Sequence, residues 1–137
     1  MGKISGPLLD RIDLHIEVTP VKYENLESHI LSESSEDIRK RVNKARKIQS
    51  NRYKDYGIFS NSELTPKLID RYCKLDDNCK NMLQNAFNKL GLSARAYGRI
   101  LKVARTIADL DDNECIKDNH LLEAIQYRSL DRKYWSK

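Results

Sequence analysis

The sequence lacks a glycine-rich phosphate-binding loop, because no G-x-x-x-x-G-K-[ST] motif occurs along its 137 residues. Its five glycines are Gly2, Gly6, Gly57, Gly91 and Gly98. The H-E-x-x-H motif of zinc peptidases is also missing, and no motif suggests a Ser-His-Asp triad. We therefore expect that the chain alone does not hydrolyse nucleoside triphosphates.

Long apolar runs and paired cysteines are missing as well. No run approaches the roughly 20 residues that span a bilayer, and the start of the chain has no apolar signal-peptide core. Cys73, Cys79 and Cys115 form an odd set without a C-x-x-C pair, which favours a cytoplasmic protein with reduced thiols. Their spacing gives little support to a zinc site with His120, so we predict no metal site.

The composition is that of one polar, helix-rich domain. Hydrophobic residues make up 39% of the chain and charged residues 33%, and the length allows a real core. The formal net charge is +5. This excess permits contact with nucleic acid but does not establish it, so the position of the charges matters more.

Apolar periodicity and capping residues predict five helices, at 35–53, 66–73, 77–90, 94–109 and 118–127. The predicted N-terminal caps are Ser34 or Ser35, Thr65, Asp76 and Ser93, and Gly91 is the predicted stop of the third helix. The expected buried stripes include Ile38, Val42, Ala45 and Ile48 in the first helix, and Tyr97, Ile100, Leu101, Ala104, Ile107 and Ala108 in the fourth. Residues 12–18 alternate and predict a strand, with Ile12, Leu14, Ile16 and Val18 on one face.

The helix at 35–53 contains a strongly basic stretch. Between Arg39 and Lys54 there are eight basic residues and no acidic one. Such a helix can follow a phosphate backbone, and it can equally be a solvated face. The candidate nucleic-acid-binding residues are Lys40, Lys44 and Lys47, together with Arg99 and Lys102 of the fourth helix.

Four separate blocks carry a family resemblance. They are Ile4–Asp13 (ISGPLLDRID), Glu33–Arg39 (ESSEDIR), Leu92–Leu110 (LSARAYGRILKVARTIADL) and His120–Arg128 (HLLEAIQYR). In this order they resemble the C-terminal region of the magnesium-chelatase-like AAA+ ATPases of the ComM/YifB type. The resemblance runs from Ile4 to about Trp135.

This resemblance implies a mainly α fold, in which a small helical bundle, the AAA+ C-terminal lid, follows one strand left over from the AAA+ core. Residues 1–22 would end the core, 23–129 would form the lid and 130–137 a tail. The family's phosphate loop, its Mg-binding acidic motif and its N-terminal domain are absent from the sequence. We therefore expect a fragment of a larger protein that binds ATP and Mg, with no cofactor for the fragment alone.

The resemblance also implies roles and partners. The Leu-Leu-Asp-Arg motif makes Arg11 the arginine finger, which stabilises charge on a phosphoryl group in a neighbouring subunit. Arg95 matches the sensor-2 arginine of the lid, in cis or in trans, and Arg99 and Lys102 are predicted to share its helical face. The expected partners are the AAA+ core of the same protein, the other subunits of a homohexamer and, as a candidate, DNA undergoing branch migration, with no membrane.

From the residues alone, other interpretations remain open. Arg11 could simply pair with Asp10 or Asp13 at the surface, and Arg95 could lie on a solvated basic face. Arg105 points elsewhere on its helix and is expected to be structural. The rival function is a stand-alone basic helical module that binds nucleic acid through its first helix.

Overall fold

The computed structural model describes residues 8, 11–18, 20 and 33–128, and this part of the chain is mainly helical. The helices are α3 (Ser35–Tyr53), α4 (Pro66–Tyr72), α5 (Asp77–Leu90), α6 (Ala94–Leu110) and α7 (Asp118–Gln126). Two short 3-10 helices, η1 (Lys54–Tyr56) and η2 (Asn61–Glu63), lie between α3 and α4. The predicted domain boundaries at 22/23 and 129/130, and the tail 130–137, lie outside the described residues.

Three of the predicted N-terminal caps accept a backbone hydrogen bond through their side chains, whereas Thr65, at the start of α4, does not. The backbone N–H of Asp37 donates to Ser34 Oγ at 3.1 Å, and the N–H of Ala96 donates to Ser93 Oγ at 3.2 Å. Asp76 accepts in the same way from Cys79 N at 2.8 Å. Gly91 ends α5 in the left-handed region, with φ +57°, a conformation that glycine adopts without steric cost. The helical bundle predicted from the sequence is confirmed.

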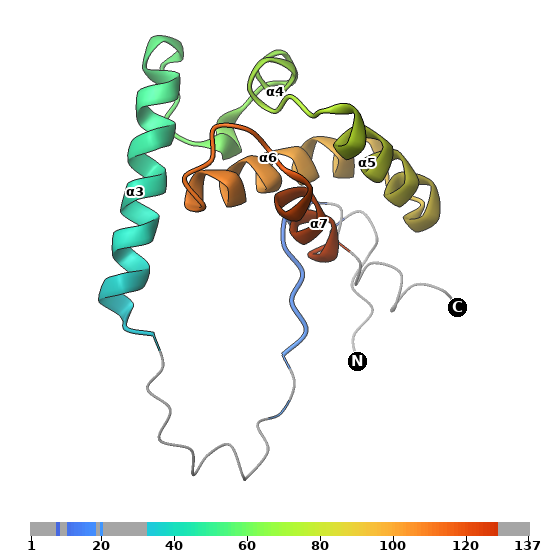
Figure 1. The fold of residues 1–137 in the computed structure, drawn as a ribbon, viewed down its shortest axis with the longest axis horizontal. Helices are drawn as coiled ribbons and strands as arrows, with labels where there is room; N and C mark the ends of the chain where they lie inside the picture. Colours follow the sequence, from blue (N-terminus) through green and yellow to red (C-terminus); the bar gives the residue numbers. More distant parts are fainter. Residues whose placement is uncertain (1–7, 9–10, 19, 21–32, 129–137) are drawn as a thin grey trace.

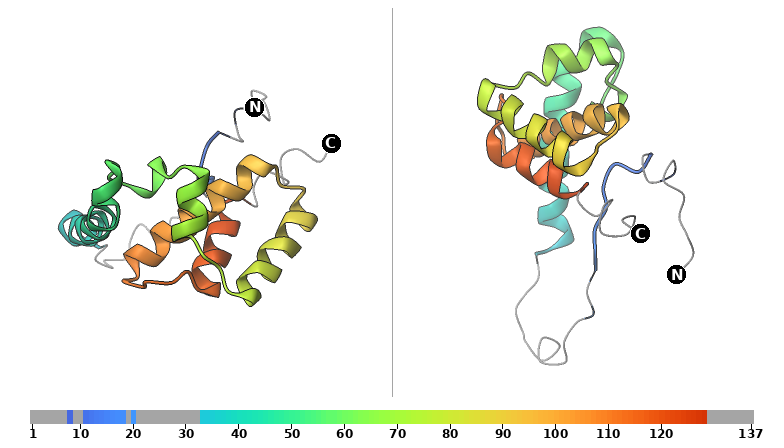
Figure 2. Two further views of the ribbon diagram at one scale, coloured as in Figure 1. Left: turned by 90° about the horizontal axis from the view of Figure 1, so that it is seen from above. Right: turned by 90° about the vertical axis from the view of Figure 1, so that its right-hand side faces the viewer.

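Helix α6 lies at the centre of the bundle and packs against α3, α4, α7 and η2. Figure 1 shows α3 standing at one end of α6 and α5 lying toward the other. The view from above in Figure 2 shows the same order, with α3 seen end-on. Helix α7 packs against both α6 and α5. The central position of α6 fits its sequence, since its small and branched side chains allow neighbours to approach from several sides.

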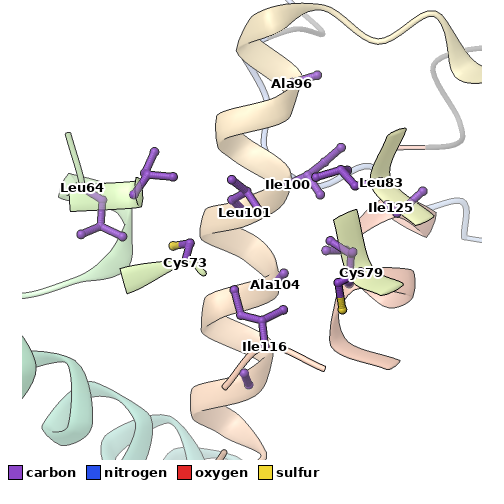
Figure 3. Close-up of a cluster of buried hydrophobic side chains, with 14 of the residues drawn as sticks. Leu64, Cys73, Cys79, Leu83, Ala96, Ile100, Leu101, Ala104, Ile116 and Ile125 are labelled. Atoms are coloured by element: carbon purple, nitrogen blue, oxygen red, sulfur yellow. The ribbon is translucent and has the colours of Figure 1, made fainter. Parts of the chain in front are cut away.

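The core surrounds α6 on two sides. Figure 3 shows Leu64 and Cys73 on one side of this helix and Leu83, Cys79 and Ile125 on the other. Within α6 itself, Ala96, Ile100, Leu101, Ala104 and Ala108 are buried. No described helix is both long enough and apolar enough to cross a membrane.

The predicted strand at 12–18 is wrong, because no residue of this segment is in a strand. Ile12, Leu14, Ile16 and Val18 are exposed by 40%, 46%, 68% and 86%. An alternating pattern forms a strand only where a neighbouring backbone completes its hydrogen bonds, and no strand is present among the described residues to do so. The segment instead contacts the helices, as described below.

Parts of two predicted stripes are also exposed. Ile38 and Val42 in the first half of α3 are 43% and 41% exposed, and Tyr97 in α6 is 45% exposed. Helix α3 meets α6 through its second half, where Ala45, Gln49 and Tyr53 are buried. The apolar periodicity therefore predicted the helices correctly, but it wrongly predicted that these three side chains are buried.

Candidate functional site

The C-terminal end of α6 holds a buried ionic cluster. The Arg52 guanidinium of α3 donates from Nη1 to Asp109 Oδ2 at 2.9 Å and pairs with Oδ1 through Nη2. Arg105, one turn before Asp109, pairs with it at 3.1 Å and donates to the backbone carbonyls of Asn113 and Glu114. Burial lowers the pKa of Arg52, but its contacts with Asp109 and Tyr53 more than offset this and raise it. Arg105 is structural, as predicted.

Neutral polar groups complete this cluster. The Asn61 amide donates to Asp109 Oδ2 at 2.9 Å and to Thr106 Oγ1 at 3.0 Å, and its carbonyl accepts from the Tyr53 hydroxyl at 2.6 Å. The backbone N–H of Asn61 donates to Gln49 Oε1 at 3.1 Å. Both Asp109 oxygens thus have partners from α3, η2 and α6. The cluster joins α3 to α6, and each of its three charged groups has a partner within it.

The N-terminal end of α6 is different, because its arginine is available. Arg95 is exposed in the first turn, immediately after the Ser93 cap. The structure records no hydrogen bond or ion pair between the Arg95 side chain and any described residue. The first turn of a helix also presents backbone N–H groups and a partial positive charge, which favour an anion. Arg95 therefore stands where it could contact a phosphate.

Arg99 and Lys102, predicted to share the face of Arg95, have partners in different directions. Arg99 Nη1 pairs with Asp13 of the N-terminal segment. Lys102 Nζ donates to the carbonyl of Ser62 in η2 at 2.8 Å. Only Arg95 of the three therefore has no recorded partner, and a shared phosphate-contacting face would require the other two to change partners.

Arg11 is exposed and lies at the start of the described segment 11–18. Its backbone N–H donates to the carbonyl of Leu8 at 3.0 Å. Asp13 is one of the two surface partners considered for Arg11, but it pairs with Arg99. The other residue offered, Asp10, lies outside the described part. The Arg11 side chain has no recorded partner among the described residues.

An apolar groove lies close to Arg95. It has a volume of about 380 Å³ and is formed by α5, Leu75 and the first turn of α6. Its lining includes Phe87, Ala94 and the half-exposed Tyr97, with Lys80 as the cationic side chain. The groove explains why Tyr97 is not buried, since α5 does not close over this end of α6.

The candidate lysines of α3 differ in their pairing. Lys40 pairs with Glu36 at 2.9 Å, and Lys44 pairs with Asp112 at 2.9 Å. Lys47 is exposed and has no recorded ion pair. All of these pairs are solvent-exposed and therefore weak, so a polyanion could displace them. Arg99 and Lys102 lie on another helix, and the structure joins them to other partners.

The described residues bring one possible set of metal-binding groups together. Ligand atoms of Asp76, Cys79 and Asp118 lie within 4.8 Å of one another. The Cys79 thiol donates to Asp118 Oδ1 at 3.0 Å, and Asn78 donates to the other oxygen. Burial, followed by the hydrogen bonds with Asp118 and Asp76, raises the pKa of the Cys79 thiol to about 12. A protonated thiol makes this group a structural link between α5 and α7, and His120 is not part of it.

His120 has a structural role at the start of α7. Its Nδ1 accepts from the backbone N–H of Lys117 at 3.1 Å. The proton of a neutral ring is therefore on Nε2, which lies 3.0 Å from Asp111 Oδ2. This hydrogen bond lowers the pKa of the Asp111 carboxyl group.

Comparison with known proteins decides the family. Residues 32–128 match the family model described as the magnesium chelatase, subunit ChlI C-terminal domain. The chain belongs to this family. The magnesium chelatase C-terminal match covers every described helix, including the cluster around Asp109 and the exposed end of α6 at Arg95.

Three relatives extend the similarity beyond the magnesium chelatase C-terminal domain. The chain is 45% identical to the competence protein ComM of Haemophilus influenzae over 133 residues, or 96% of this chain and 25% of that protein. It is 40% identical to the uncharacterized protein YifB of Escherichia coli over 96% of this chain and 26% of YifB. An uncharacterized protein of Mycobacterium bovis is 30% identical over 93% of this chain and 25% of its own length. The chain thus spans about a quarter of the curated relatives that it matches.

Proposed function

We propose that this chain is the C-terminal lid region of a magnesium-chelatase-like AAA+ ATPase that forms a hexameric ring. In this proposal Arg11 is the arginine finger for a neighbouring subunit, and Arg95 is the sensor-2 residue that contacts the nucleotide phosphates. ATP and Mg bind to the AAA+ core of the same protein. Hydrolysis moves the lid, and the ring remodels DNA, with branch migration as the reaction.

The observation that carries this proposal is the family match over residues 32–128, in which Arg95 occupies an exposed first helical turn without a recorded partner. The competence protein among the relatives supports DNA as the substrate. Arg11 is likewise exposed and has no recorded partner for its side chain. A guanidinium in this situation can form two parallel hydrogen bonds to phosphate oxygens and stays charged at any working pH.

The test replaces Arg11 and Arg95 singly by alanine in the complete ATPase. ATP binding should survive, whereas hydrolysis should fall by about 10³–10⁵-fold for Arg11→Ala, because only transition-state contacts are lost. Arg71→Ala, which removes an exposed arginine of α4, is the matched control and should retain wild-type hydrolysis. Equal hydrolysis by the wild type and Arg11→Ala would contradict the finger assignment.

A mixing experiment tests whether Arg11 acts in trans. Arg11→Ala protein is combined with protein whose phosphate-binding loop is inactivated, and each is also measured alone. Mixed rings contain some interfaces that pair an intact loop with an intact Arg11, so part of the activity should return. If mixing restores nothing while each protein still assembles, Arg11 does not act across the interface. The chain alone should show no hydrolysis.

The exposed, acid-free stretch of α3 favours a second candidate function, direct binding of nucleic acid through Lys40, Lys44 and Lys47. Binding of this chain to labelled DNA is measured by fluorescence anisotropy at several salt concentrations. Lys47→Ala should reduce the slope of log affinity against log salt by about one, because one phosphate contact is lost. Lys89→Ala on α5 is the control. Identical slopes for wild type and Lys47→Ala would exclude Lys47 from the interface.

A further inference from the structure

The N-terminal segment is attached to the helical bundle at three places, through residues 12, 13 and 15. Asp13 pairs with Arg99 of α6. The carbonyl of Ile12 accepts from the Arg128 guanidinium, and the backbone N–H of His15 donates to the carbonyl of Tyr127 at 3.0 Å. Figure 1 shows this segment running from the bundle next to α7. Because the contacts come from α6 and from the two residues that follow α7, they restrict the direction of the segment as well as its position.

The attachment is stronger than a simple surface ion pair. The side chain of Arg99 is 29% exposed, so its charge is only partly screened, whereas Asp13 is 54% exposed. Arg128 is 1% exposed, and it donates a charge-assisted hydrogen bond from inside the bundle. The backbone bond of His15 adds a contact that does not depend on charge. Together the three contacts join residues 12–15 to the bundle through both side-chain and backbone groups.

The spacing connects the two proposed phosphate-contacting arginines. Asp13 lies two residues after Arg11 in the sequence, so a hold on Asp13 also restricts where Arg11 can lie. Arg99 lies one helical turn after Arg95, on the same face of α6. Helix α6 therefore carries both the proposed sensor-2 residue, Arg95, and the residue that binds the arginine-finger segment, Arg99. A shift of α6 changes the position of both.

We propose that Arg99 is a positioning residue for Arg11. Its ion pair with Asp13 ties the arginine-finger segment to α6, so that nucleotide contact at Arg95 alters the presentation of Arg11 to the neighbouring subunit. This inference rests on the proposed function for the role of Arg11, but the ion pair can be tested without it. In this proposal Arg99 acts through its ion pair with Asp13 and is given no phosphate contact of its own.

The first experiment measures hydrogen–deuterium exchange at the amide of His15 in this chain. Asp13→Asn, Arg99→Gln and the double variant are compared with the wild type, and Arg71→Gln is the control. Each single variant should speed exchange about two- to fivefold, the size expected for losing a partly exposed ion pair. The double variant should be no faster than either single one, because both remove the same interaction. Unchanged exchange in the single variants would overturn the proposal.

The second experiment measures ATP hydrolysis in the complete ATPase. Arg99→Gln should lower kcat while leaving the KM for ATP unchanged, since the finger is misplaced and the nucleotide pocket is intact. The reversed pair, Asp13→Arg with Arg99→Asp, should recover part of kcat. A rise in KM without loss of kcat, or no recovery by the reversed pair, would contradict a positioning role. Wild-type hydrolysis by Arg11→Ala would instead refute the proposed function and leave the exchange result standing.

Discussion

The two ends of α6 hold arginines in opposite situations. At the C-terminal end, Arg105 is 2% exposed, its charge is paired with Asp109, and it donates to two carbonyls. At the N-terminal end, Arg95 is exposed and has no recorded partner among the described residues. One helix thus separates an arginine that stabilises the fold from one that is available to a ligand. The difference lies in the surrounding partners, because the residue type and the helix are the same.

The largest effect on stability should come from removing the buried ion pairs at the C-terminal end of α6. Asp109→Ala removes the carboxylate shared by Arg52 and Arg105 and leaves two cations without their partner. We expect the free energy of unfolding to fall by about 3–5 kcal/mol, measured by urea denaturation. Lys44→Ala, which breaks only the exposed pair with Asp112 near the same end, should cost less than about 1 kcal/mol. Equal losses in the two variants would remove the distinction between buried and exposed pairs.

A smaller effect should appear on acidification, just beyond the C-terminal end of α6. The hydrogen bond from His120 lowers the pKa of Asp111 below its ordinary value of 3.8. The stabilisation from this bond is therefore complete above that pH and is lost as the pH falls through the lowered pKa. Between about pH 5 and about pH 2, urea denaturation should show a larger loss of stability for the wild type than for Asp111→Asn. Parallel profiles of stability against pH for the wild type and Asp111→Asn would show that the Asp111 carboxylate contributes nothing to stability.

The smallest effect on stability should come from replacing Arg95 at the N-terminal end of α6. Arg95→Ala removes an exposed side chain without a recorded partner, so the free energy of unfolding should change by less than about 0.5 kcal/mol. Thermal and urea denaturation of this chain provide the measurement. A loss above about 1 kcal/mol would place Arg95 with Arg105 as a structural residue and would weaken its proposed contact with phosphate.

The helices could be predicted from sequence because their signals are local. Ser34, Asp76, Gly91 and Ser93 act within one turn of their own position, and each has the predicted role. The exposure of Ile38 could not be predicted in this way, because it depends on where α3 meets α6. Periodicity identifies a face of a helix, but it does not show how much of that face another helix covers.

The candidate site was predicted less completely, since its main contacts join distant residues. The pair Asp13–Arg99 is separated by 86 residues, and no local pattern links them. Asp109 was missed as the centre of the buried cluster. The available signal was an acidic residue one turn after Arg105 within an apolar stretch, where a charge needs a buried partner. The strand at 12–18 failed because alternation alone does not supply a neighbouring strand.

The length and rigid fastening of α6 have a mechanical consequence. Its 17 residues make a rod about 25 Å long. Arg105 binds the carbonyls of the loop that leads to α7, and Asp109 binds Arg52 of α3, so the far end of the rod is fixed to both neighbours. A force applied at Arg95 would therefore act on the end of α6 that lies opposite its fixed end. A displacement of Arg95 that moves α6 as a unit would also displace Arg52 of α3, through its ion pair with Asp109.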